Sequence, residues 1–576
     1  MLDGPLLERK LHDPHWTSPQ FSEGGARDAL GVETLSEAIL ADLLPGINNQ
    51  TGRARYYSFW AWVLRDFILD ERATHTQMGF YEWLRRREDT LILANLHHDC
   101  GVGAAGTTQG AQVWQDGSRS AYDVTWKSLL SVSGGAYQLY YRGVLQEMNI
   151  TLDSGDGPHD ELTKTLGVPL ADAYAASVAE TAYVRRYLDA AKLSKPIIED
   201  FAGHGCLCEL HQHEAERKAL VAAFFRFDSP DAFAVRRLAS LCFFLDVIEQ
   251  SNGQPLTQMD MRKVMYFWSF GTDHAYQPVG NLLEPAQRWR CFQLRQWFVF
   301  ALESLWSRFL KRIEVESLRG SEYMAWLLPR LNLTAMAQEF GAELPHADAR
   351  SLPARVFYEA VRDALPAGAL KAGPLSLSTP LNEGALADPI WRKESETDVQ
   401  VRVGHALLML VLMYYRCQPW QDQPGWRYLS NSFGAGRLPV EGYLHRVDRA
   451  LAEDWSLSRW LGWLHSHCLW LQHRRVALQK LASRSQETAS FEVADEEEGE
   501  GIGALAQTNE PLFRGLRTDS PKMNAPRFPS ALRILADLRL IEPLSTEGYG
   551  LLADGKALLD QFRNYSVPTV DEAESV

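Results

Sequence analysis

The sequence predicts a mainly α-helical, multi-domain assembly that ends in a small winged-helix (α+β) module. Its 576 residues are too many for one hydrophobic core. Hydrophobic residues make up 46% of the chain, and 18 tryptophans are among them, so a large core can be buried. Apolar residues recur at helical spacing along most of the chain, and alternating runs typical of strands are few.

The first predicted domain is a helical one covering residues 1–150. Residues 33–44 have helical spacing and stop at Pro45-Gly46, and a second helix follows with Thr51 as its expected N-cap. One apolar face runs continuously along this second helix, so we expect it to be buried rather than to stack on bases. The residues of that face are Tyr56, Phe59, Trp60, Val63 and Phe67.

Two arginines stand at the start of the second helix. Arg53 and Arg55 follow a turn and precede the aromatic face. Because a helix N-terminus favours anions and a guanidinium binds carboxylate or phosphate in a bidentate way, both are candidate nucleic-acid or partner-binding residues.

A large helical domain is expected over residues 160–487, after a polar break at residues 151–160. Its longest predicted helix starts at Glu284, with Leu294, Phe298, Leu302, Leu305 and Phe309 on one face. The most apolar run, "HALLMLVLMYYR" from His405, is shorter than the ~20 residues that span a bilayer, so we expect a buried helix. No signal peptide is recognisable, and seven cysteines are an odd number, so the sequence favours a cytoplasmic protein with reduced thiols and no membrane association.

The C-terminal part divides into a linker, a module and a tail. Residues 488–508 are acidic and Gly-rich, as expected of a solvated linker. Residues 509–565 read as helix, hairpin, helix, the order of a winged helix, with Pro529–Leu538 in the recognition-helix position. Residues 566–576 are expected to be a disordered tail.

Cations of the predicted module are candidate ligands for DNA phosphates or for a partner protein. Residues 509–563 hold eight Lys and Arg against seven Asp and Glu, and the whole chain has a net charge of -15. This small excess of positive charge provides little attraction for DNA phosphates, so the sequence does not distinguish DNA contact from protein docking. The candidates are Arg527, Arg533, Arg539 and Lys556.

One cluster of soft ligands stands out in "GHGCLCELHQHE". Zinc sites use four Cys or His ligands, and this stretch offers His204, Cys206, Cys208, His211 and His213. A single Cys-x-Cys lacks the second pair of closely spaced ligands that zinc sites usually contain. The sequence therefore favours ordinary free thiols beside a polar turn and predicts no cofactor. A zinc site is the alternative. His97, His98 and Cys100 could contribute, but the sequence does not place them nearby.

Two stretches resemble a family of uncharacterised bacterial proteins. They are "ADLLPGINNQTGRARYYSFWAWVLRDF" near the N-terminus and, near the C-terminus, "QHRRVALQKLASRSQETASFEV" followed by "NAPRFPSALRILADLRLIEP" and "LLADGKALL". The family consists of domains of unknown function, some of them found near antiphage defence genes. The resemblance implies a bacterial, defence-related role and transfers no catalytic residue.

Three functions follow as hypotheses. The favoured one is a non-enzymatic subunit of an antiphage-defence or DNA-maintenance complex, acting as a helical scaffold whose winged helix contacts DNA or a partner such as an ATPase. The first alternative is a metal-dependent nuclease or nucleotide-acting effector with its site in the middle domain. The second is a transcriptional regulator. Whether the chain is an enzyme stays open, although the sequence leans against it.

Overall fold

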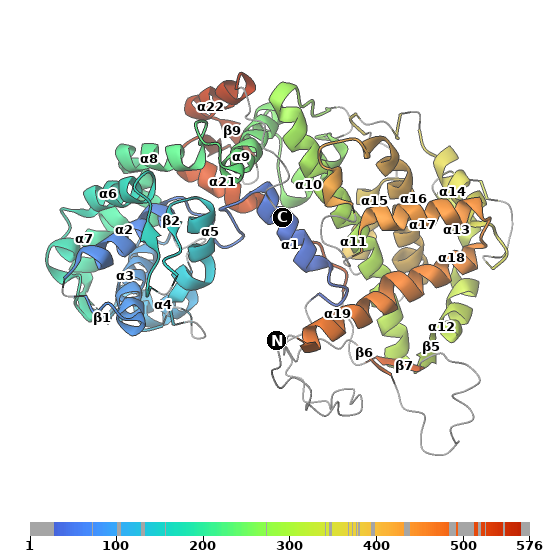
Figure 1. The fold of residues 1–576 in the computed structure, drawn as a ribbon, viewed down its shortest axis with the longest axis horizontal. Coiled ribbons are helices and arrows are strands. Elements are labelled where there is room, and N and C mark those ends of the chain that lie inside the picture. Colours follow the sequence, from blue (N-terminus) through green and yellow to red (C-terminus); the bar gives the residue numbers. More distant parts are fainter. Residues whose placement is uncertain are drawn as a thin grey trace, which may run out of the picture. The chain divides into compact units, whose positions relative to one another are not determined.

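Helices dominate the computed structural model of the chain, which confirms the predicted fold class (Figure 1). The structure describes residues 28–565 apart from 72, 101–104, 128, 130–132, 156, 272–273, 340, 342, 345–347, 349, 367, 371–372, 376, 378–380, 393–397, 431–437, 483–490, 494–511, 516–519, 525 and 545–547. The expected tail, and all of the expected linker except a short strand at residues 491–493, lie outside these residues.

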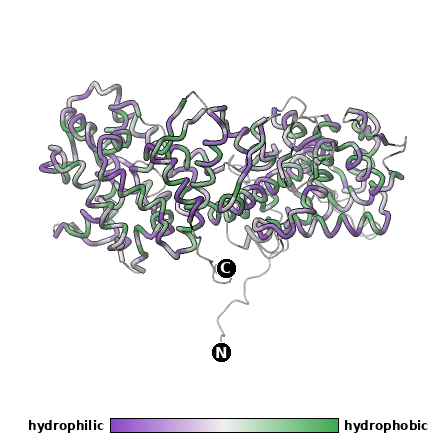
Figure 2. Tube along the Cα trace, turned by 90° about the horizontal axis from the view of Figure 1, so that it is seen from above, coloured by the Kyte–Doolittle hydropathy of each residue, from purple (hydrophilic) through white to green (hydrophobic). Residues whose placement is uncertain are grey.

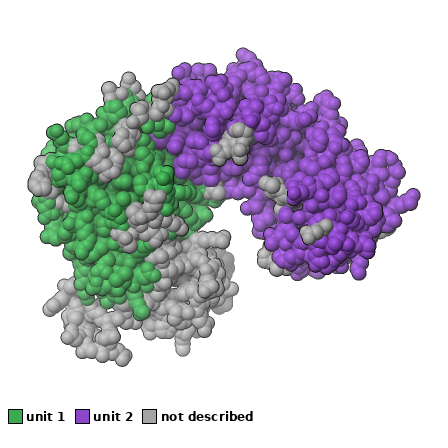
Figure 3. All heavy atoms as spheres, turned by 180° about the vertical axis from the view of Figure 1, so that it is seen from behind, with its two compact units in different colours: residues 1–37, 290–524 green, residues 38–289, 525–576 purple. Residues whose placement is uncertain are grey.

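The chain divides into two compact units, each built from separate stretches of sequence (Figure 3). Unit 1 contains residues 1–37 and 290–524, and unit 2 contains residues 38–289 and 525–576. This division differs from the expected boundaries at residues 150–160 and 488–508. Two helices run across it, α1 (Val32–Leu43) and the 33-residue α11 (Leu283–Val315).

Unit 2 is a helical body with short strand pairs at its edges. Its helices up to residue 289 are α2 (Arg55–Leu69), α3 (Gln77–His97), α4 (Thr107–Trp114), η1 (Gln115–Gly117), η2 (Tyr137–Tyr141), α5 (Arg142–Glu147), α6 (Gly167–Val178), η3 (Tyr183–Tyr187), α7 (Lys195–Gly205), η4 (Leu207–Gln212), α8 (Glu214–Phe224), α9 (Ala232–Ser251), α10 (Gln258–Phe267) and η5 (Gly280–Leu282). Its antiparallel pairs are β1 (Ala121–Asp123) with β4 (Lys192–Ser194), and β2 (Thr151–Leu152) with β3 (Glu161–Leu162).

Helix α2 lies at the centre of unit 2 because nearly all of its sides are apolar. The predicted face from Tyr56 to Phe67 is fully buried, and so are most residues between. The helix packs chiefly on α6, and also on α3 and α8. Thr51 is not its N-cap: the helix begins at Arg55, and the Thr51 hydroxyl instead accepts the Asn48 N–H at 2.9 Å.

The C-terminal module has the predicted order of helix, hairpin and helix. It consists of α21 (Phe528–Asp537), the antiparallel strands β8 (Ile541–Pro543) and β9 (Tyr549–Leu551), and α22 (Ala553–Arg563). The module belongs to unit 2, where α21, β9 and α22 all pack on α9. It begins later than expected, because β7 (Leu512–Gly515) pairs with strands of unit 1.

Unit 1 is organised around the predicted long helix α11 and the apolar helix α16 (Ala406–Cys417). The predicted face of α11 is buried, as is nearly every side chain of α16. A three-stranded sheet of order β5-β7-β6 joins Leu318–Arg319, Leu512–Gly515 and Phe491–Val493. The other helices are α12 (Gly320–Leu327), η6 (Leu328–Arg330), α13 (Leu333–Glu339), α14 (Ala354–Asp363), α15 (Glu383–Trp391), η7 (Gln400–His405), η8 (Gln418–Trp420), η9 (Trp426–Tyr428), α17 (Val440–Ala452), α18 (Leu457–Trp463), η10 (Leu464–Trp470) and α19 (Leu471–Ala482).

Hydrophilic and hydrophobic residues alternate along the helices of both units, as expected of amphipathic helices that cover a core (Figure 2). Within the described part of the chain, no helix is both long enough and apolar enough to cross a membrane.

Candidate metal centre

The first half of the candidate centre is the turn that ends α3. His98 is the C-cap of the helix, and Asp99 adopts a left-handed conformation with a φ of 51°. The N–H of Cys100 then bonds back to the carbonyl of Asn95 at 3.1 Å. This tight turn places His98 and Cys100 at the end of α3.

The second half is the junction between α7 and η4. Cys206 is the C-cap of α7, and its carbonyl accepts the N–H of Glu209 at 3.0 Å as the 3₁₀ helix begins. Cys206 is buried and Cys208 is half-buried. Helices α3 and α7 pack on each other, so their ends bring the two turns into contact.

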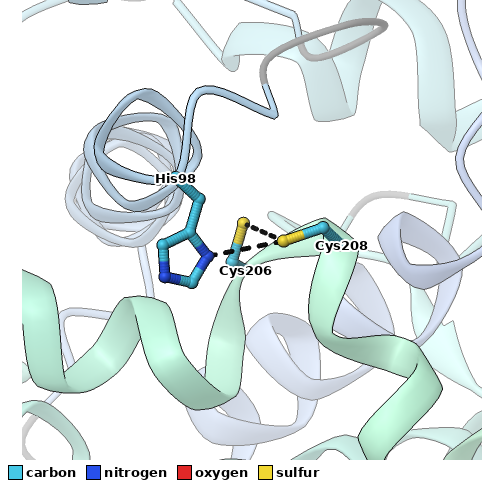
Figure 4. A group of neighbouring side chains, drawn as sticks. All are labelled: His98, Cys206 and Cys208. Atoms are coloured by element: carbon cyan, nitrogen blue, oxygen red, sulfur yellow. Dashed lines mark hydrogen bonds between the residues drawn. The ribbon is translucent and has the colours of Figure 1, made fainter.

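Three thiols and one imidazole meet at this contact. The ligand atoms of His98, Cys206 and Cys208 all lie within 4.8 Å of one another (Figure 4). His98 Nδ1 is 3.4 Å from Cys208 Sγ, which is 3.3 Å from Cys206 Sγ. Cys100 Sγ is 2.9 Å from Cys206 Sγ, which adds a third sulfur to the group.

Two polar side chains border the four. Asn95 Oδ1 is 3.1 Å from Cys206 Sγ and accepts the Leu207 N–H at 3.2 Å. Glu209 Oε1 lies 3.2 Å from Cys208 Sγ and 3.5 Å from His98 Nδ1. The ligand group is therefore surrounded by groups that fix its backbone and its imidazole.

Arg53 and Arg55 hold the backbone of the same two turns. Arg53 Nη1 donates to the carbonyl of Cys100 at 3.4 Å, and Arg55 Nη1 donates to the carbonyl of Cys206 at 2.6 Å. Two guanidinium groups thus hold the backbone carbonyls of the two cysteines on which the turns meet.

The thiols perturb one another's pKa values. Hydrogen bonding from Cys206 and Cys208 lowers the pKa of Cys100 well below the usual thiol value. Hydrogen bonding to Cys100 raises the pKa of Cys206 and of Cys208, because a second thiolate would lie against the first. A thiolate at one of these sulfurs therefore disfavours a second thiolate beside it.

The structure keeps two of the five sequence-predicted metal ligands in this group. His204 and His211 are exposed, and His213 is half-buried with Nε2 directed 3.1 Å from the carbonyl of His204. His211 Nδ1 lies 2.9 Å from the carbonyl of Cys208. Among the described residues, the three histidines form no metal-binding group with Cys206 and Cys208.

Sequence reasoning missed His98 and Cys100 as members of the site. Nothing in the sequence places them near residues more than 100 positions later in the chain. One signal was present: His-x-Cys and Cys-x-Cys share the same one-residue gap, and each follows a helical stretch.

The structure places Arg55 in the interior of unit 2, which corrects its expected availability to phosphate. Its side chain and that of Glu216 are both fully buried, and they form a bidentate pair with contacts of 2.9–3.2 Å. Glu216 also accepts the hydroxyls of Ser58 at 2.7 Å and Ser177 at 2.8 Å.

Arg53 is nearly buried and joins α2 to the C-terminal module. Its Nε donates to Asp537 Oδ2 at 2.9 Å, and the same oxygen accepts the Ala54 N–H at 3.0 Å. Burial raises the pKa of Asp537 above the usual carboxyl value, although the pair with Arg53 acts in the opposite direction.

Two of the four candidate cations of the module are engaged within unit 2. Arg527 is nearly buried and donates to the carbonyls of Leu44 and Ile47 at 3.5 and 3.0 Å. Lys556 forms ion pairs with Glu249 and Asp560. These contacts anchor the module, so neither side chain is free for phosphate in this arrangement.

Arg533 and Arg539 have a different environment. Both are exposed, the first on α21 and the second just after it in a left-handed conformation with a φ of 55°. They are the candidate cations of the module that solvent or a partner can reach.

Comparison with known proteins adds no family assignment. No family model, curated protein or solved structure matches the chain.

Proposed function

We propose that the chain is a non-enzymatic subunit of a bacterial protein complex concerned with antiphage defence or DNA maintenance. In this proposal the helical units are the scaffold, and the exposed face of the C-terminal module docks on a partner protein, such as an ATPase, rather than reading DNA. The bacterial and defence setting rests on the resemblance of the two terminal stretches. The preference for protein over DNA rests on the surroundings of α21.

The observation that carries the preference is that the chain itself covers the start of α21. The N-terminal residues of a recognition helix reach base edges in the major groove. Here Phe528, Ser530 and Ala531 are buried. A Cβ built on Gly52 would lie 3.0 Å from Ser530 Oγ and 3.1 Å from Ser530 Cα, so the segment that precedes α2 occupies the space that a base pair would need.

The contacts on the other sides of the module also favour docking on a protein over binding to DNA. Arg217 of α8 pairs with Asp554 at 3.1 Å, and Arg563 of α22 pairs with Asp246 of α9 at 2.7 Å. Asn281 donates to the carbonyl of Phe562 at 2.8 Å. A module fixed on several sides is suited to present a rigid surface to a partner protein.

The surface left for a partner includes Arg533 and Arg539. Two cations in a chain with a net charge of -15 provide little of the counterion release that drives DNA binding. Arginine is, however, enriched among the residues that dominate protein interfaces, where it binds carboxylates. An acidic protein surface is therefore the expected partner.

DNA binding is tested with a labelled duplex in fluorescence anisotropy over a range of salt concentrations. The variant Arg533→Glu/Arg539→Glu is compared with Arg355→Glu/Arg392→Glu, which makes the same charge change at exposed sites of unit 1. We expect the two variants to behave alike. Selective weakening by the module variant, with a salt slope reduced by about two, would establish DNA contact instead.

Partner docking is tested with the same two variants by affinity capture from the native cells. We expect a stoichiometric partner with the unmodified chain and with the Arg355/Arg392 variant, and its loss with the Arg533/Arg539 variant. The proposal is contradicted if both variants retain the same partner, or if the unmodified chain captures none.

A further inference from the structure

We propose that His98, Cys100, Cys206 and Cys208 bind one zinc ion as a closed, structural Cys₃His site. The sequence pattern alone pointed to a different ligand set, with three histidines that the structure places elsewhere. The proposal is independent of the proposed function, because it concerns the folding of unit 2 and no partner.

The separations are near those of ligands around a tetrahedral ion. With Zn–S near ~2.3 Å and Zn–N near ~2.0–2.1 Å, neighbouring ligand atoms of a tetrahedron are about 3.5–3.8 Å apart. The separations for His98–Cys208 and Cys208–Cys206 are 3.4 and 3.3 Å, and Cys100–Cys206 is 2.9 Å. All three separations are shorter than the tetrahedral values, so binding an ion requires the ligand atoms to move apart, and Cys100, which is not among the three residues whose ligand atoms all lie within 4.8 Å of one another, has to turn its sulfur towards the ion.

The ligand types select zinc over harder cations. Thiolates and imidazole suit zinc, whereas calcium and magnesium require oxygen ligands. Three thiolates with a divalent ion leave one net negative charge. Arg53 and Arg55, each of which also pairs with a carboxylate, donate to the carbonyls of Cys100 and Cys206 and so hold both turns without occupying a coordination position.

The surroundings indicate a structural rather than a catalytic ion. Four protein ligands fill a tetrahedron, whereas a catalytic zinc keeps one position for water or substrate. The two ligand pairs come from the ends of α3 and α7, more than 100 residues apart, so the ion cross-links two helices. Arg53 also pairs with Asp537, so the cross-link lies directly beside the anchor of the C-terminal module.

Glu209 is the competing fourth ligand, because Oε1 lies near both His98 and Cys208. Gln212 donates to its other oxygen. We assign Glu209 the outer role of fixing the imidazole, since metal-bound histidines commonly have a carboxylate beside them.

The first experiment measures zinc in the full chain, purified under reducing conditions and reloaded with one equivalent of ZnCl₂ before gel filtration. We expect one zinc per chain, and its loss in Cys100→Ser and in Cys206→Ser. Matched controls are Cys242→Ser, a buried thiol of α9, together with His211→Ala, both of which should keep the ion. Absence of zinc from the unmodified chain, retention by Cys100→Ser, or loss in His211→Ala would overturn the assignment.

A second experiment does not depend on the loss of zinc binding, so it stays informative where a serine variant fails to fold. The variant His98→Cys would create a four-thiolate site that still binds one ion. Cobalt replaces zinc in such sites, and its visible absorption reports the ligands. We expect tetrahedral cobalt bands in the unmodified chain and a shift of these bands towards the four-thiolate pattern in His98→Cys. An unshifted spectrum would remove His98 from the site.

Discussion

The substitution Arg55→Ala distinguishes a structural arginine from a binding one. Arg55 was a candidate ligand for phosphate or a partner, yet the structure buries it completely against Glu216. If the buried pair is its role, the substitution lowers the free energy of unfolding. If Arg55 is instead a surface ligand, the substitution leaves the free energy of unfolding unchanged and weakens only the binding of phosphate or a partner.

The size of the loss follows from what the substitution leaves behind. Removing one partner of a buried ion pair costs about 3–5 kcal/mol, because the other charge stays buried and uncompensated. Glu216 retains the hydroxyls of Ser58 and Ser177, which offset part of that cost. The carbonyl of Cys206 loses its donor, which adds about 1 kcal/mol. We therefore expect a loss of about 4 kcal/mol for the unfolding of unit 2.

The measurement is urea denaturation followed by circular dichroism, together with a thermal melt. At roughly 2–4 °C per kcal/mol for a unit of this size, the melting temperature should fall by about 8–16 °C. The matched control is Arg65→Ala, since Arg65 also belongs to α2 but pairs with Asp172 of α6 at the surface. An exposed pair contributes at most about 1 kcal/mol, so this variant should melt near the unmodified protein.

A double variant tests the electrostatic origin of the loss. Arg55→Met/Glu216→Leu removes both charges, so most of the lost stability should return. The reasoning is refuted if Arg55→Ala melts with the Arg65→Ala control, or if the double variant is as unstable as Arg55→Ala.

Three further predictions concern the module and unit 1. Arg53→Ala should increase hydrogen exchange of α21 selectively, because Asp537 loses its buried partner. Unchanged exchange in α21 would contradict the claim that the Arg53–Asp537 pair anchors the module. Gly52→Val should destabilise the same contact by about 1–3 kcal/mol in urea denaturation, because its side chain would overlap Ser530, and an unaltered midpoint would show that the space is open. Burial lowers the pKa of His465 to about 4 from 6.5, so the unfolded state binds the extra proton between these pH values. Stability should therefore fall by about 1.4 kcal/mol per pH unit from about pH 6.5 to 4, and His465→Phe should lack that part of the slope.

The helical architecture was predictable because local periodicity determines it. The apolar faces of α2 and α11 are visible in the sequence at i, i+3 and i+4 spacing, and both are buried as expected. The helix–hairpin–helix order of the C-terminal module was predictable for the same reason, since turn residues and apolar runs alternate within a short stretch. The two-unit division was not, because contacts between residues far apart in sequence leave no local signal.

The candidate site shows the same limit at the level of single residues. The sequence predicts Cys206 and Cys208 as candidate ligands, and the histidines nearest in sequence as their partners. The structure instead supplies His98 and Cys100 from the end of another helix. The position of Arg53 and Arg55 at the start of a helix predicts phosphate- or partner-binding residues, whereas the acidic residues that pair with them lie more than 150 positions away.

The most direct test of the metal centre is X-ray absorption at the zinc edge of the purified, reduced full chain. The account predicts three sulfur scatterers at about 2.3 Å and one nitrogen at about 2.0–2.1 Å per zinc. Cys100→Ser should lose this signal, whereas His211→Ala should reproduce it. A shell of nitrogen and oxygen alone, or two sulfurs with two histidine nitrogens, would contradict the assignment of Cys100 and His98.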